Sequence, residues 1–148
     1  MASPITITAT ARNPEGRELE LARVLLVDDD LTSRLTLKAV LEAGGYFVDA
    51  AASAAEAVGK LDERQYELVL SDLQMESPEA GLKVLAHARL MDYKPATAIL
   101  TTYRTRRTDS TRPFLISPED LPELLEKVAD LISHRAARMV QRQLRQAQ

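Results

Sequence analysis

The chain has 148 residues, of which 45% are hydrophobic and 4% aromatic, and it contains no cysteine. This length supports one domain with appendages around an aliphatic core, and the lack of cysteine excludes disulfides and thiolate metal sites. No apolar run reaches membrane-spanning length and no signal-peptide pattern opens the chain, so we expect a cytoplasmic protein that does not contact a membrane.

The first 22 residues are expected to form an extension rather than part of the domain. Residues 5–8 alternate apolar and polar side chains like a short strand, and residues 13–16 have the composition of a turn. We predict that this arm becomes ordered only where it meets a sheet edge or a partner.

Three acidic residues follow the first strongly apolar run. Residues 24–27 are Val, Leu, Leu and Val, without polar alternation, which predicts a strand buried on both faces of a parallel sheet. Asp28, Asp29 and Asp30 come next and must leave the core where the strand ends. Because adjacent carboxylates repel each other, they favour a hard cation such as Mg²⁺ or Ca²⁺ between them. Taken alone, the same residues also fit a solvated loop with a helix cap.

Two helices and a short strand are predicted next. The first helix covers about residues 32–43, with Leu35, Ala39 and Val40 on one face, and Gly44 and Gly45 end it. Residues 46–50 read as a short strand. Residues 53–56 have the spacing of a capping box and open a helix that continues to about residue 64.

Two further strands also end in polar residues. Residues 67–72 contain the short apolar run Leu68-Val69-Leu70 and end at Asp72, and the run of residues 96–100 ends at the hydroxyls of Thr101 and Thr102. Neighbouring parallel strands would bring Asp72 to the same edge of the sheet as Asp28 and Asp29. In open α/β sheets this carboxyl edge is where ligands bind.

The remaining pattern completes an α/β fold. A loop at residues 74–80 precedes a helix with Leu82, Val84, Leu85 and Ala88, residues 114–116 form a fifth strand, and a last helix of nearly thirty residues begins near residue 120. Strands that alternate with helices predict a doubly wound five-stranded parallel sheet with helices on both faces. We assign residues 23–132 to the domain and residues 133–148 to a C-terminal helical extension.

The motifs together resemble the receiver domain of bacterial response regulators, over about residues 23–132. Residues 24–30 are similar to its first strand and acidic pair, and residues 70–75 to its phosphoacceptor segment. Residues 81–85 resemble the start of its third helix, and Pro95 with residues 98–101 resembles its fourth strand. The resemblance implies a flavodoxin-like receiver fold and a signalling role in a two-component phosphorelay rather than an enzyme.

The resemblance also implies a role for each matching residue. Asp72 would accept a phosphoryl group from a histidine kinase or phosphotransfer protein. Mg²⁺ would be bound by Asp29, Asp72 and the backbone carbonyl of Gln74, with Asp28 acting through water. Thr101 would hydrogen-bond the phosphoryl group, and Phe114 would follow that movement as the switch aromatic.

This sequence departs from the family after the fourth strand. Ser117 occupies the position of a lysine that the family uses to pair with the phosphoryl group, and a hydroxyl cannot supply that charge. An alternative alignment places Arg112, Pro113 and Phe114 at the lysine-proline segment but leaves almost no fifth strand. Residues 103–112 are polar and basic, without the apolar periodicity of a fourth helix, and Arg104 or Arg112 could stand in for the lysine.

The loop after Asp72 carries an additional carboxylate. Glu76 lies where the family commonly has proline, and the loop is one residue longer than usual. The extra carboxylate could add to a metal site or slow the entry of a phosphoryl group by repulsion. Both alternatives stay open.

The last helix continues beyond the expected end of the fold. Leu124, Val128, Leu131 and Ile132 are predicted to pack on the sheet, whereas residues 134–148 should add little to the core. Arginines recur at three- and four-residue spacing from residue 135 to residue 145. We interpret this part as a docking or homodimerisation element. One alternative is nucleic-acid binding, for which the positive charge is the only indication. The other is a basic helix face that is exposed to solvent and has no partner.

Three functions follow from these observations. The first is a stand-alone receiver that is phosphorylated on Asp72 and signals by docking to a downstream protein. The second is a degenerate receiver that works as a phosphorylation-independent interaction module, which Ser117 favours. The third, nucleic-acid binding through the C-terminal helix, has the least support.

Overall fold

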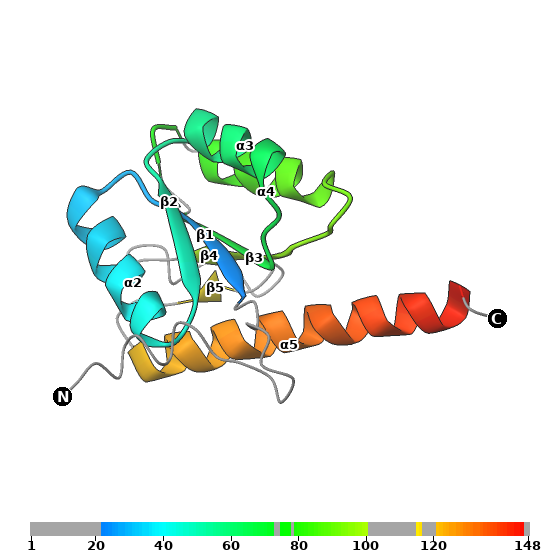
Figure 1. Cartoon of the computed structure of the whole chain (residues 1–148). Helices are drawn as coiled ribbons and strands as arrows, with labels where there is room; N and C mark the ends of the chain where they lie inside the picture. Colours follow the sequence, from blue (N-terminus) through cyan, green and yellow to red (C-terminus); the bar gives the residue numbers. More distant parts are fainter. Residues whose placement is uncertain (1–21, 73–74, 78, 101–114, 117–120, 147–148) are drawn as a thin grey trace.

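The computed structural model describes residues 22–72, 75–77, 79–100, 115–116 and 121–146, and these form an α/β fold (Figure 1). Along the chain the elements are β1 (Arg23–Val27), α2 (Leu31–Ala43), β2 (Phe47–Ala51), α3 (Ala54–Glu63), β3 (Leu68–Asp72), α4 (Ala80–Arg89), β4 (Ala96–Leu100), β5 (Leu115–Ile116) and α5 (Leu121–Gln146). The predicted α/β class and parallel sheet are confirmed.

All strand pairs are parallel, and the sheet has the order β2-β1-β3-β4-β5. This is the order of doubly wound sheets of the flavodoxin type, in which the first crossover runs to one side and the next reverses direction. The reversal occurs between β1 and β3, which lie side by side in the centre. Their carboxyl ends therefore form the crevice where such folds bind ligands.

Successive side chains of the central strands point to opposite faces of the sheet, so two separate cores form. One contains Val24, Leu26 and Leu70 together with residues of α2 and α5. The other contains Leu25 and Val69 together with residues of α3 and α4. In Figure 1 the strands lie between these two helical layers. Because helices cover both faces, β1 and β3 carry no polar alternation.

The helix ends follow the local sequence signals. Asp30 caps α2 by accepting a hydrogen bond from the Ser33 backbone N–H at 2.8 Å. Gly45 has a φ of 103°, a left-handed conformation that suits glycine after the last turn of α2. Ser53 caps α3 by accepting a hydrogen bond from the backbone N–H of Glu56 at 3.1 Å. The glycine stop and the Ser53 helix start are both confirmed.

The predicted buried face of α2 was partly wrong. Leu35 is 58% exposed and Ala39 is exposed, whereas Leu37 and Leu41 belong to the core and Val40 packs against it. Two apolar stripes are compatible with a 3.6-residue period in this helix. The packing of α2 against the sheet and α5 selects the second stripe and leaves the first in solvent.

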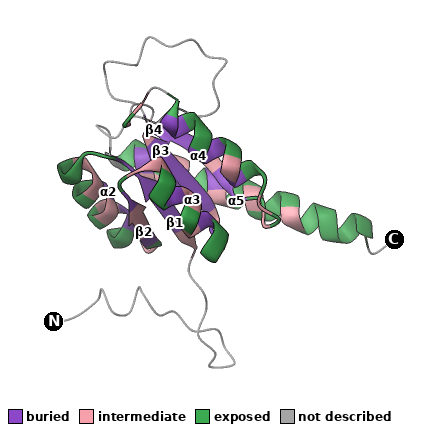
Figure 2. Ribbon diagram, turned by 90° about the horizontal axis from the view of Figure 1, so that it is seen from above, coloured by how far each residue is buried: buried purple, intermediate pink, exposed green. Residues whose placement is uncertain are grey.

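The last helix packs on the sheet through the residues that its periodicity predicts. Leu124, Val128 and Leu131 are buried, and Ile132 packs against the same core. From residue 133 onward the described part of α5 is mostly exposed and extends past the sheet (Figures 1 and 2).

One residue of the extension nevertheless contributes to the fold, contrary to expectation. The Arg135 guanidinium donates hydrogen bonds to the backbone carbonyls of Tyr93 at 2.6 Å and Lys94 at 2.9 Å. These carbonyls belong to the turn before β4, where Lys94 has a φ of 45°. Arg135 therefore satisfies polar groups of a turn that would otherwise need water.

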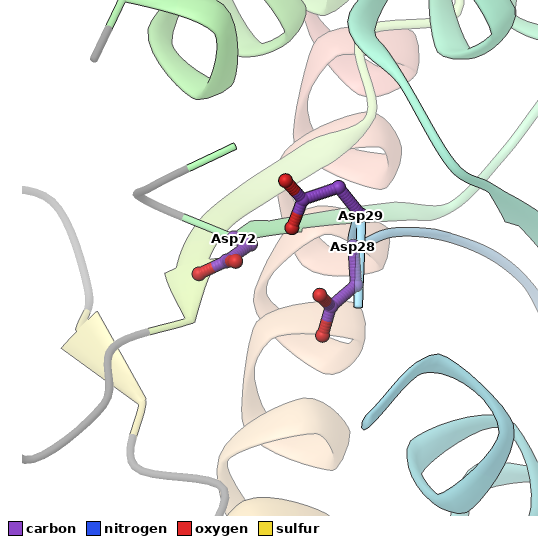
Figure 3. A group of neighbouring side chains, drawn as sticks. All are labelled: Asp28, Asp29 and Asp72. Carbon is purple, nitrogen blue, oxygen red and sulfur yellow. The ribbon is translucent and has the colours of Figure 1, made fainter. Parts of the chain in front are cut away.

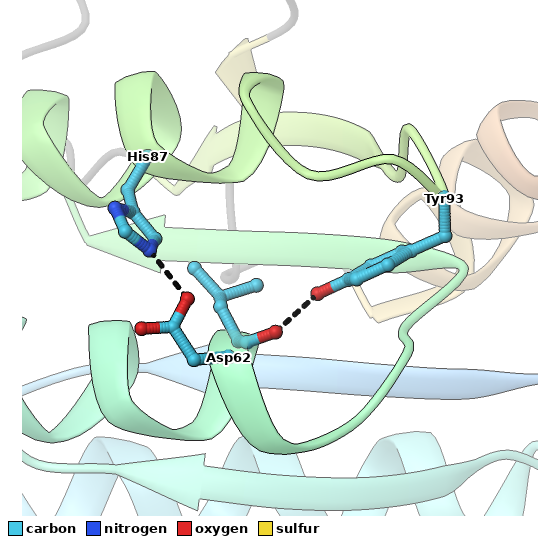
Figure 4. A network of polar contacts seen from close by, with 4 residues as sticks. Asp62, His87 and Tyr93 are labelled. Carbon is cyan, nitrogen blue, oxygen red and sulfur yellow. Dashed lines mark hydrogen bonds and ion pairs between the residues drawn. The ribbon is translucent and has the colours of Figure 1, made fainter.

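Helices α3 and α4 are joined by polar contacts near the same edge of the sheet (Figure 4). The His87 imidazole Nε2 lies 2.8 Å from the Asp62 carboxylate, and the Tyr93 hydroxyl donates to the Leu61 carbonyl at 2.9 Å. Burial raises the pKa of the Tyr93 hydroxyl to about 12, so it stays protonated and donates at neutral pH. These contacts hold the second helical layer together where the strands begin.

Among the residues that the structure describes, no helix combines the length and the apolar character that crossing a membrane requires.

Candidate functional site

The acidic strand ends meet at the carboxyl edge of the sheet. Val27 of β1 is in register with Ser71 of β3, so the residues that follow, Asp28 and Asp72, leave the two central strands at the same level. Figure 3 shows the side chains of Asp28, Asp29 and Asp72 grouped at this edge. Carboxylate oxygens of all three lie within 4.8 Å of one another. The predicted convergence of these carboxylates is therefore present in the structure.

The three carboxylates differ in their exposure to solvent. Asp28 is 5% exposed, Asp72 is half-buried and Asp29 is exposed. Burial raises the pKa of Asp28 above its usual value, and the negative charges of Asp29 and Asp30 add to this effect, whereas the backbone N–H of Asp30 and the positive charge of Arg34 oppose it. A cation at this point would remove both the repulsion and part of the desolvation cost.

Asp30 and Arg34 hold the first loop of the site in place, and the sequence did not indicate this role for Arg34. The backbone N–H of Asp30 donates to the Asp28 carboxylate at 3.0 Å, and the Arg34 guanidinium donates to the Asp28 carbonyl at 2.8 Å. Arg34 lies one turn into α2. The only indication of its contact with Asp28 in the sequence is that a cation lies close to an acidic cluster. Together these bonds order the loop between β1 and α2.

The sequence left the role of Glu76 open, and the structure shows which group its carboxylate contacts. Its carboxylate accepts a hydrogen bond from the Ala54 backbone N–H at 3.1 Å, at the start of α3. The N-terminus of a helix favours negative charge because its first N–H groups have no partner within the helix. Glu76 is thus directed to α3 and is not among the three residues of the acidic group.

The geometry of the acidic group fits a hard divalent cation. Two oxygens on opposite sides of Mg²⁺ lie about 4.2 Å apart, twice the metal–oxygen distance of about 2.1 Å. Two oxygens at adjacent positions lie about 3.0 Å apart, so carboxylates within 4.8 Å of one another are close enough to approach a common ion. Oxygen donors alone suit Mg²⁺, Ca²⁺ or Mn²⁺ rather than softer metals.

Four predicted site residues lie outside the described residues, namely Gln74, Thr101, Phe114 and Ser117. The same holds for Arg104 and Arg112. Their proposed roles as carbonyl ligand, switch pair and phosphoryl contact stay predictions.

Comparison with known proteins identifies the family. The model of the response regulator receiver domain matches residues 24–112, more than half of the chain. The chain therefore belongs to the response regulator receiver domain family, which acts in two-component signalling. The matched region ends before β5 and Ser117.

Curated relatives are longer than this chain. The transcriptional regulatory protein ZraR of Klebsiella oxytoca is 27% identical over 121 residues, which cover 78% of this chain and 27% of that protein. A gliding motility regulatory protein of Myxococcus xanthus is 33% identical over 130 residues, covering 88% of this chain and 14% of the relative. The chain spans about a quarter of the length of the ZraR proteins that it matches.

Solved structures share the fold. The response regulator protein TrrA of Thermotoga maritima, in complex with Mg²⁺-BeF, is 31% identical with a TM-score of 0.65, covering 75% of this chain and 99% of that one. A response regulator receiver protein of Sinorhizobium medicae has a TM-score of 0.67 at 22% identity, covering 78% and 98% of the two chains. Both alignments span nearly the whole of the other chain, so the common fold is the complete receiver.

Proposed function

We propose that this receiver accepts a phosphoryl group on Asp72 from a histidine kinase or phosphotransfer protein and passes the signal on by docking to a downstream protein. The observation that supports this most is the meeting of Asp28, Asp29 and Asp72 at the carboxyl edge of β1 and β3, within 4.8 Å. Asp72 ends a central strand, where the rigid sheet holds its backbone while its side chain is half-buried.

The proposed transfer is a nucleophilic displacement at phosphorus. A carboxylate oxygen of Asp72 forms the new bond to phosphorus as the bond between phosphorus and the donor imidazole nitrogen breaks. The imidazole keeps the bonding electron pair and takes up a proton.

Asp28, Asp29, Asp72 and the Gln74 carbonyl would hold Mg²⁺, and the TrrA complex with Mg²⁺-BeF supports this assignment. When bound, the ion supplies positive charge that neutralises the phosphoryl oxygens and the nearby carboxylates. The clustered carboxylates would otherwise repel an anionic donor.

The start of α2 offers a docking surface beside this site. Leu31 and Leu35 are each 58% exposed and lie one helical turn apart, immediately after the acidic loop. Exposed leucines at this spacing suit contact with an apolar helix face of a partner. The substitution Leu35→Ser should therefore slow transfer from a protein donor while leaving labelling by a small phosphodonor unchanged.

Intact mass spectrometry tests the proposal. Incubation with Mg²⁺ and acetyl phosphate should add one phosphoryl group to the wild type and none to Asp72→Asn. Asp92→Asn is a matched control, because Asp92 is an exposed acid in the turn before β4, at the opposite edge. Absence of labelling in the wild type, or equal labelling of Asp72→Asn, would contradict the proposal.

A second candidate function is an interaction module that works without phosphorylation. It is favoured by Ser117, which stands where the family has a lysine. A serine hydroxyl cannot replace an ammonium charge beside the phosphoryl group, and the lost interaction is about 1–3 kcal/mol. With such a loss, a receiver that switches between two states would stay mostly in its inactive state after phosphorylation.

The substitution Ser117→Lys separates the two candidates. In a working receiver it should enlarge the phosphorylation-induced NMR shifts at Thr101 and Phe114 without moving the modification from Asp72. A full response already present in the wild type would mean that another cation, such as Arg104 or Arg112, supplies the charge. If neither protein is labelled, the interaction module becomes the better description.

A further inference from the structure

Helix α5 divides its charges between its two halves. In the first half Glu126 and Asp130 are exposed acids. From residue 131 to the end of the helix there is no acidic residue, and His134, Arg138, Arg142 and Arg145 are exposed. Two such helices side by side attract each other when antiparallel and repel each other when parallel, because only the antiparallel arrangement sets opposite charges level.

The second half of α5 has a surface that the described core does not cover. Residues beyond Ile132 belong to neither core, and Val140 and Leu144 are 53% and 61% exposed. Figure 2 shows this half as an exposed rod that projects from the domain. A neighbouring helix can therefore lie along it without displacing the packing of the domain.

A groove with cationic walls lies at the middle of the same helix. It has a volume of about 340 Å³ and runs between the start of β4 and α5, with a floor that includes Pro95, Ala96 and Leu131. Two arginines, Arg89 and Arg138, and the imidazole of His134 line it, and no acidic residue does. The groove is thus suited to an acidic helix face.

The charged residues next to the groove share one face of α5. Asp130, His134 and Arg138 follow one another at four-residue spacing, which places them on a single stripe. The stripe changes from acidic to basic at His134, close to the midpoint of the 26-residue helix. A charge pattern that reverses about its own centre is complementary to itself under a two-fold axis.

We propose that α5 binds α5 of a second copy of this chain in an antiparallel arrangement, with the two-fold axis near His134. Asp130 and Arg138 are both four residues from His134, so Asp130 of each copy lies level with Arg138 of the other. Glu126 and Arg142 are both eight residues away and also meet at one level. Each pair occurs twice because the interface is isologous.

This inference names a partner for the C-terminal part of α5, which the sequence suggested as a docking or homodimerisation element, and it does not depend on phosphorylation of Asp72. Exposed ion pairs are individually weak and are screened by salt. The dimer should therefore form at low ionic strength and weaken by about tenfold or more as the salt concentration rises from about 50 mM to about 500 mM. Sedimentation equilibrium measures this dissociation constant directly.

Charge exchange tests the register. Arg138→Asp should make the protein monomeric at low salt, and the double variant Asp130→Arg with Arg138→Asp should dimerise again, because both pairs between positions 130 and 138 are restored with their signs reversed and both Glu126–Arg142 pairs are unchanged. Asp130→Arg with Arg145→Asp is the matched control. It has the same net charge but places the exchanged residues at different levels, so it should stay monomeric.

Cross-linking tests the position of the axis, since the chain contains no cysteine of its own. His134→Cys should form an intermolecular disulfide at low salt, because two cysteines at the axis can approach within the about 7 Å between Cα atoms that a disulfide allows. Gln141→Cys should not, because its two copies would lie about 21 Å apart along the helix.

A wild type that is monomeric at every salt concentration would overturn the proposal. So would a charge exchange that fails to restore the dimer, or equal cross-linking of the two cysteine variants. Phosphorylation of Arg138→Asp by acetyl phosphate, followed by intact mass, should match that of the wild type. A failure of the dimer and a failure of the Asp72 chemistry are therefore seen in separate measurements.

Discussion

Charged side chains are arranged differently at the two edges of the sheet. At the carboxyl edge, Asp28, Asp29 and Asp72 gather three like charges within 4.8 Å. At the other edge, charged and polar groups are paired. His87 contacts Asp62, and Arg135 donates to the carbonyls of Tyr93 and Lys94. The first arrangement costs stability in the absence of a cation, and the second contributes to it.

Residues suited to binding a ligand and residues that stabilise the fold thus lie at different edges of one small domain. Strand ends at the carboxyl edge bring their carboxylates together, where a bound cation can relieve the repulsion between them. At the opposite edge, the backbone carbonyls of the turn before β4 accept hydrogen bonds from the Arg135 side chain. Substitutions at the two edges should therefore have effects of opposite sign on the apo protein.

The largest effect is expected for Asp29→Asn. This variant removes one direct carboxylate from a mostly hydrated ion, so Mg²⁺ binding should fall below detection. The apo protein should become slightly more stable, because repulsion from Asp28 and Asp72 decreases. NMR titration with Mg²⁺ and thermal unfolding without it measure the two effects. Unchanged Mg²⁺ affinity would place the ion elsewhere.

The next largest effect is expected for Arg135→Ala, which should lower the free energy of unfolding by about 1 kcal/mol, because the partly buried carbonyl of Tyr93 and the exposed carbonyl of Lys94 lose their charged donor. Deleting residues 134–148 should cost a similar amount, whereas deleting residues 140–148 should cost little. Urea unfolding at high salt measures the difference without a contribution from dimerisation. Equal stability of the two truncated chains would mean that the Arg135 contacts contribute nothing.

Asp28→Asn should raise the stability of the apo protein by less than Arg135→Ala lowers it, because it removes a buried charge whose pKa is raised by desolvation. Asparagine can still accept the hydrogen bond from the Asp30 backbone N–H. Adding Mg²⁺ should stabilise the wild type more than this variant. A loss of apo stability would show that the hydrogen bonds of the carboxylate outweigh its desolvation.

The smallest effect is expected for His87→Ala at the opposite edge. The pair with Asp62 is largely exposed, so its loss should cost about 0–1 kcal/mol. The double variant with Asp62→Ala should cost no more than His87→Ala alone. A strongly additive double variant would indicate that the two residues act through other contacts.

Much of the fold was predictable because its signals are local. The bounds of β4 agree with the prediction to the residue, and β1, β2, β3, α2 and α3 differ by a residue or so at their ends. Apolar runs without alternation, a capping Ser53 and a glycine stop each act within a few residues. The convergence of Asp28 and Asp72 was predictable as well, because parallel strands end at the same edge.

Contacts between distant segments were not predictable in this way. Nothing near Glu76 in the sequence indicates that it accepts from the backbone of Ala54, 22 residues away. Arg135 resembled its solvated neighbours on α5, although it binds carbonyls 41 and 42 residues away. The choice between two apolar stripes on α2 also depends on where α5 and the sheet lie.

The sequence by itself determined the order of strands and helices, the family and the acidic strand ends, since burial on both faces forces an uninterrupted apolar run and expels the carboxylates that follow it. Only the tertiary structure decided which α2 residues are buried, which partner Glu76 has and how Arg135 supports the turn before β4. These outcomes depend on the positions of groups brought together from distant parts of the chain, and a local pattern of residues does not encode those positions.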